Sequence, residues 1–224
     1  MSAAVCRLSR HARTWSRSKV NTRGGARLGS MPEISHVRIA VPEQGTLNRI
    51  LREGGTTMFP QWLYAEPGDE ARILWWGVRS APVQALDLPA PDDPRFGLFP
   101  RPIDDWTEAP RAVVLATVDA QRAEADLEPA LGSAWHDAGD DAVLGARCRR
   151  LSLGRSDLVI AEPTTEGYAA ACLARFGEGP IAVALDGTTS AGRIAHTNPV
   201  SSGPATYVRV GPATAPTLIF LPAG

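Results

Sequence analysis

The stretch GRSDLVIAEPTTEGYAAACLARFGEGPIAVALDG, residues 154–187, decides the fold. Its apolar, β-branched run 157–163 predicts a strand that a proline ends. Residues 164–179 carry an apolar side chain at every fourth position, which predicts a helix followed by a glycine-rich turn. The run 180–186 predicts a second strand. The stretch therefore joins two structural units through a connecting helix.

The unit before this join repeats an order that is also found near the amino terminus. Residues 111–163 predict a strand, a helix capped by Asp119 and ended by Gly132, and three further strands. The amino-terminal unit predicts a helix ended by Gly54, between strands near 36–41, 61–65, 71–78 and 82–88. After the join, two more strands follow near 206–212 and 216–223, with at most a weak helix before them.

This repetition divides the chain into five parts. Residues 32–90 form a first βαβββ-like module and residues 91–110 a connector rich in Pro and Asp. Residues 111–163 form a second βαβββ module, and residues 164–224 the connecting helix and a shortened third module. We expect residues 1–31 to be a disordered basic leader or a non-native extension, and leave them out of the fold.

The leader has a composition of its own. It holds seven basic residues and no acidic one, and it lacks the apolar core of a secretory signal. A transit peptide, a cloning remnant around Gly29–Met31 and translation from a start upstream of Met31 all stay open.

The remaining 193 residues hold 16 basic and 24 acidic side chains, a formal net charge of −8. Such an acidic body argues against nucleic-acid binding, which needs a basic face. No apolar run reaches the roughly 18–20 residues of a membrane span. The three cysteines show no metal-binding or disulfide spacing, so a cytoplasmic location is expected.

The repeated order and two short signatures resemble the vicinal oxygen chelate superfamily, which includes glyoxalase, dihydroxybiphenyl dioxygenase and bleomycin resistance proteins. The stretch LVIAEP…LARFGEGPIAVALD is similar to the family's join between modules, and SHVRIAVPE at 35–43 is similar to an opening strand. The resemblance implies an α+β fold in which repeated βαβββ modules form a curved, cup-like mixed sheet. It also implies a possible homodimer, which exposed sheet edges favour.

In that family a divalent metal lies at the bottom of the cup, held by a His, Gln or Glu on each first strand and a Glu on each last strand. The resemblance places His36, Val113 and Ala182 at the first-strand positions of the three units. It places Gln84 or Ala85, Val159, and Leu218 or Ile219 at the last-strand positions. Because apolar side chains cannot coordinate a cation, we expect no metal and no other cofactor.

A cup without a metal is suited to binding a small organic molecule between apolar walls and a few polar groups. Indole faces stack on flat ligands and also accept cations. We expect the ligand to contact a set of residues from the first two modules: Arg38, Trp62, Trp75, Trp76, Thr117 and Val159.

Catalysis is the alternative to binding. His36, His136 beside Asp137, and Glu162 are candidate general acids or bases, which would make the protein a metal-independent isomerase, cyclase or lyase. A third hypothesis keeps a metal, recruited by His36, Gln84 and acids outside the family positions. The main prediction is metal-independent binding of a small, largely apolar or aromatic molecule, of the sequestration or resistance type.

Overall fold

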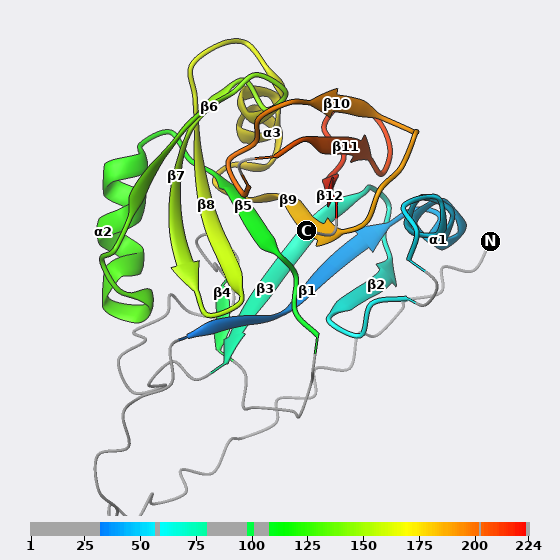
Figure 1. The fold of residues 1–224 in the computed structure, drawn as a ribbon, viewed down its shortest axis with the longest axis horizontal. Coiled ribbons are helices and arrows are strands. Elements are labelled where there is room, and N and C mark those ends of the chain that lie inside the picture. Colours follow the sequence, from blue (N-terminus) through cyan, green and yellow to red (C-terminus); the bar gives the residue numbers. More distant parts are fainter. Residues whose placement is uncertain (1–31, 57–58, 80–97, 101–107, 202, 223–224) are drawn as a thin grey trace, which may run out of the picture.

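The computed structural model describes residues 32–56, 59–79, 98–100, 108–201 and 203–222. These residues form a curled sheet of eight strands, a smaller sheet of four strands, and three helices (Figure 1). None of these helices has the length and hydropathy of a membrane span.

The large sheet consists of two modules that share one pairing pattern. Its strand order is β10-β11-β12-β9-β5-β8-β7-β6. In each module the first strand pairs in parallel with the last, β5 with β8 and β9 with β12, and β5 pairs antiparallel with β9 to join the modules. The predicted mixed α+β sheet is thereby confirmed. The elements are β5 (Ala112–Ala116), α2 (Ala120–Leu131), β6 (His136–Asp141), β7 (Ala146–Leu153), β8 (Ser156–Pro163), α3 (Tyr168–Phe176), β9 (Gly179–Asp186), β10 (Arg193–Ala195), β11 (Ala205–Arg209) and β12 (Thr217–Leu221).

The last module has no helix between its first two strands, and a helix of the amino-terminal unit packs against it instead. Only residues 187–192 link β9 to β10, too few for a helix like α2. In its place lies α1 (Gln44–Glu53), which buries Leu47, Ile50 and Leu51 in the same cluster as Phe220 of β12. At the end of α1, the Gly54 carbonyl accepts a hydrogen bond of 3.1 Å from the Thr188 N–H. Helix α1 therefore covers the outer face of the last module.

The small sheet is built differently from the two modules. Its order is β2-β1-β3-β4, so β1 lies between β2, to which it is parallel, and β3, to which it is antiparallel. The strand expected at 82–88 lies outside the described residues, and β4 falls within the expected connector. Over residues 33–79 the first unit has the predicted order of strand, helix, strand and strand, but it pairs its strands in another way than the two modules. The elements are β1 (Glu33–Val41), β2 (Leu63–Pro67), β3 (Arg72–Arg79) and β4 (Leu98–Pro100).

The large sheet separates two apolar clusters because alternate side chains of a strand point to opposite faces. On β5, Val113 and Leu115 join the outer cluster with α1, α2 and the small sheet. Ala112, Val114 and Ala116 join the inner cluster with α3. All five side chains are fully buried, so this strand is covered on both faces. Burying each larger apolar side chain contributes roughly 1.5–3 kcal/mol to stability.

Candidate functional site

The inner face of the curled sheet is the floor on which the family's chemistry would take place. Its central positions are small and apolar, and each is completely inaccessible to solvent. No oxygen or nitrogen ligand and no space for a water molecule exists at these positions. They are Ala112 and Val114 on β5, Val159 on β8, Ala182 on β9 and Ile219 on β12.

A polar clasp closes the cup over this floor. Asp141 ends β6, the last strand at one edge of the sheet, and Tyr207 lies on β11 near the opposite edge. The sheet curls so far that the Tyr207 hydroxyl donates a hydrogen bond to Asp141 Oδ2. The other carboxylate oxygen accepts the N–H groups of Val143 and Leu144 at 2.7 and 2.8 Å. Asp141 is only 2% exposed, so three donors stabilise its buried charge.

The clasp and the floor shift the pKa values of neighbouring groups. Burial, and then the charge of Asp141, raise the pKa of the Tyr207 hydroxyl well above its ordinary value. The same two causes raise the pKa of the Cys148 thiol to about 12. Cys148 is therefore a neutral, unreactive thiol on the inner face.

Two further segments fill the cup from above. Val200, in the loop before β11, is buried in the inner cluster, and its carbonyl accepts a hydrogen bond of 3.1 Å from Arg150 Nη1. From α3, the Tyr168 hydroxyl lies 2.7 Å from the Ile181 carbonyl and 2.9 Å from the Ala215 carbonyl. The predicted cup is thus an interior packed with its own side chains.

The residues present do not fit the metal that the fold family implies. Val159, Ala182 and Ile219 lie on the inner face as expected, and they offer no donor atom. Val113 lies in the outer cluster instead, so that assignment was wrong by one residue, and of the two alternatives Leu218 and Ile219 only Ile219 lies on the inner face. Gln84 and Ala85 lie outside the described residues. Within the described ranges no three His, Cys, Asp or Glu side chains are grouped to hold an ion.

Thr117, an expected ligand contact, is buried in a structural network. Its hydroxyl donates a hydrogen bond of 2.6 Å to Glu178 Oε1, which also accepts the Val118 N–H at 3.1 Å. Arg122 of α2 forms an ion pair with the same oxygen. The network ties the start of β9 to the turn between β5 and α2, and Thr117 and Val159 are both 0% exposed.

Three of the expected site residues meet on the small sheet. His36, Arg38 and Trp75 share the face that points away from the large sheet, whereas Trp76 is fully buried in the outer cluster. The His36 ring meets Trp75 edge-on at 4.8 Å between ring centroids, and the Arg38 guanidinium lies 5.5 Å from the Trp75 ring. Arg38 also forms an ion pair with Glu66. His36 is only 4% exposed, which places its ring inside the protein.

The other two candidate acids or bases lie on the large sheet. Glu162 of β8 and Asp137 of β6 line a shallow space of about 400 Å³ beside α2. His136 is exposed on β6, the edge strand. The structure therefore separates His36 from His136 and Glu162 and places them in different sheets.

A pocket lies where the two sheets meet, on the outer side of the large sheet. Its volume is about 730 Å³. Trp62, Pro60 and Leu185 are its buried apolar residues, and Phe59 contributes a ring that is 37% exposed. The remaining lining residues are polar or lack a large side chain: Gly55, Thr56, Gln61, Glu108, Ala109, Arg111, Arg155 and Asp186.

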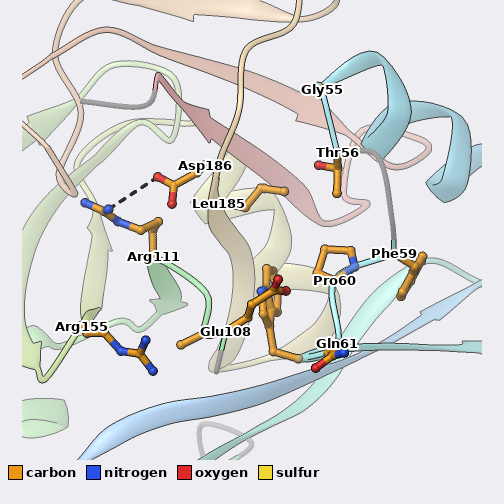
Figure 2. Close-up of a pocket in the computed structure, with 12 residues that line it drawn as sticks. Gly55, Thr56, Phe59, Pro60, Gln61, Glu108, Arg111, Arg155, Leu185 and Asp186 are labelled. Atoms are coloured by element: carbon orange, nitrogen blue, oxygen red, sulfur yellow. Dashed lines mark ion pairs between the residues drawn. The ribbon is translucent and has the colours of Figure 1, made fainter. Parts of the chain in front are cut away.

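Figure 2 shows these residues converging from four separate segments of the chain. Arg111 Nη1 forms an ion pair of 3.5 Å with Asp186 on one side of the pocket. Arg155, on the turn between β7 and β8, lies near its lower rim and binds Glu33 of β1 through Nε at 2.7 Å. Of the expected ligand contacts only Trp62 is here. No pattern in the sequence predicts the other lining residues, because only the packing of the two sheets brings them together.

The solved structures that are similar to this fold include three enzymes that match most of the chain. The 2,2',3-trihydroxybiphenyl 1,2-dioxygenase from dibenzofuran-degrading Sphingomonas wittichii strain RW1 has a TM-score of 0.56 and 9% identity, covering 87% of this chain and 91% of that one. A triple mutant of 4-hydroxymandelate synthase from Streptomyces coelicolor has a TM-score of 0.53 and 9% identity, covering 86% and 92%. BphC, a halotolerant catechol dioxygenase, has a TM-score of 0.52 and 10% identity, covering 88% of each chain. No protein-family model and no curated protein matches the sequence. At such low identity these similarities establish the fold alone.

Proposed function

The chain has the vicinal oxygen chelate fold, and we propose that it uses this fold to bind a small, largely apolar or aromatic molecule without a metal. The proposal rests on one observation: the cup of the large sheet is filled, and an open pocket lies between the two sheets instead. The floor of the cup is closed and apolar, whereas a pocket of about 730 Å³ is open between the two sheets. That volume lies within the roughly 300–1,000 Å³ of small-molecule sites.

The lining of the pocket supports a flat organic ligand. Trp62, Pro60 and Leu185 provide an apolar floor, and the Phe59 ring lies at its rim. Aromatic side chains bind flat molecules through stacking and through the large area that they bury. The charged side chains of Arg111, Arg155 and Asp186 lie at the rim, where they can orient such a ligand while its apolar part contacts the floor.

Binding is a better fit to this pocket than turnover. General acid–base catalysis needs titratable groups held close to the reacting atoms in a site that excludes water. Here Arg111, Arg155 and Asp186 expose between 49% and 60% of their side chains to solvent. Binding without turnover, in contrast, needs only an apolar lining and a polar rim, and this pocket has both.

The test is a titration of intrinsic tryptophan fluorescence against a panel of aromatic and apolar compounds. We expect saturable quenching with a dissociation constant below about 100 μM for at least one compound. The Trp62→Phe variant should lose most of the ligand-induced signal. The Trp135→Phe variant is the matched control, because Trp135 packs against the outer cluster away from the pocket.

Two results would contradict the proposal. One is a panel without saturable binding, and the other is binding whose signal depends on Trp135 but not on Trp62. Chelation with EDTA provides a separate check on metal independence, since the affinity should stay the same when divalent ions are removed.

A further inference from the structure

Both guanidinium groups that line the pocket between the sheets already take part in ion pairs. Arg111 is paired with Asp186, and Arg155 is paired with Glu33. Each guanidinium therefore already has a carboxylate partner, and neither is a preferred anchor for an anionic ligand.

Glu108 is the carboxylate of the pocket lining that takes part in neither ion pair. It lines the pocket, is exposed, and forms no ion pair with any residue that the structure describes. Figure 2 shows its side chain extending into the middle of the lining residues, on the side of the pocket opposite Thr56. The lining thus holds two guanidinium groups and two carboxylates, and Glu108 is the one of these four groups that has no ion pair with a described residue.

The aromatic lining and the charge of residues 32–224 favour the same ligand. The Phe59 and Trp62 rings line the pocket, and aromatic faces attract cations. Outside residues 1–31 the chain has a formal net charge of −8, which raises the local concentration of cationic ligands.

We propose that the ligand of this pocket is an organic cation, an amine carried on a flat apolar or aromatic body, with Glu108 as the group that binds its charge. The inference rests on the proposed function, because it names the class of molecule that the same pocket takes. The apolar body would lie on Trp62 and Leu185, and the ammonium would approach Glu108.

Three probes of one shape separate charge from stacking: 1-naphthylmethylamine, 1-naphthalenemethanol and 1-naphthoate. Isothermal titration of the full chain with each probe should rank the amine about fivefold tighter than the alcohol, with the carboxylate weakest. In Glu108→Gln the affinity for the amine should fall to within twofold of the alcohol, whose own affinity should stay unchanged. Glu128→Gln is the control, since Glu128 is an exposed acid on α2 outside the pocket.

The outcomes distinguish this inference from the proposed function. Tightest binding of the carboxylate, or an amine preference that survives Glu108→Gln, would overturn the inference and leave small-molecule binding intact. Absence of binding by all three probes and by the wider compound panel would overturn the proposed function itself. A matched loss in Glu128→Gln would show that the effect belongs to the overall charge and not to Glu108.

Discussion

Removing the Tyr207 hydroxyl tests whether the clasp holds the cup closed. In Tyr207→Phe the ring stays, but Asp141 Oδ2 loses the donor that reaches it from the opposite side of the sheet. Hydrogen bonds to charged groups contribute about 1.5–3 kcal/mol, and the two N–H groups on Oδ1 remain. We therefore expect the free energy of unfolding to fall by about 2 kcal/mol.

The buried thiol of Cys148 reports whether this loss opens the cup. Cys148 is fully buried on the inner face, so a thiol reagent reaches it only when the inner face opens. A loss of about 2 kcal/mol in a local opening equilibrium should speed labelling of Cys148 about 30-fold. Urea denaturation measures the stability, and mass spectrometry of labelled peptides identifies which cysteine has reacted.

Tyr168→Phe is the matched control for this experiment. It removes another buried hydroxyl, which bonds to carbonyls near α3 and not to the clasp. Its labelling of Cys148 should rise only as far as its global stability falls. The reasoning is refuted if Tyr207→Phe changes the stability by less than about 0.5 kcal/mol and leaves the labelling rate unchanged.

Gly77→Ala should cost about 1–3 kcal/mol in urea denaturation, because the added Cβ would lie 2.0 Å from Cε1 of the buried His36 ring. Gly54→Ala should loosen the contact between α1 and the large sheet, since its Cβ would lie 1.9 Å from Cε1 of Phe220. Amide hydrogen exchange in α1 should then become faster. Unchanged exchange would contradict the packing of α1 against the last module. Millimolar Mn²⁺, Zn²⁺ or Fe²⁺ should leave the melting temperature unchanged, whereas a saturable rise would contradict the metal-free interpretation. Stability should fall as pH rises from about 9 to about 12, because the Cys148 thiol then ionises only in the unfolded state; its share, up to about 1.4 kcal/mol per pH unit, should be absent in Cys148→Ala.

The local structure could be predicted from the sequence because it depends on residues that are neighbours along the chain. The cap at Asp119, the end of a helix at Gly132 and the connecting helix with Tyr168 on its buried face are all confirmed. The alternation of Trp75 and Trp76 also predicted that they lie on opposite faces of one strand.

The register of the central strands could not be predicted from the sequence. Residues 112–116 are all apolar and all buried, so no alternation of polar and apolar side chains marks which ones face the cup. A shift of one residue moves a side chain to the other face, which is how Val113 came to be assigned to the floor. The conclusion that the floor lacks metal ligands survives the shift, because both faces of this strand are apolar.

Sequence by itself determined the order of helices and strands from residue 111 to residue 186 and the apolar character of the central strands, since both follow from residue type and short-range spacing. The tertiary structure alone decided that the cup is closed by Asp141 and Tyr207, that α1 serves the last module, and that the open pocket lies between the sheets. These features depend on how far one sheet curls and how another packs on it. Both are set by contacts between residues distant in the chain, to which no local pattern is sensitive.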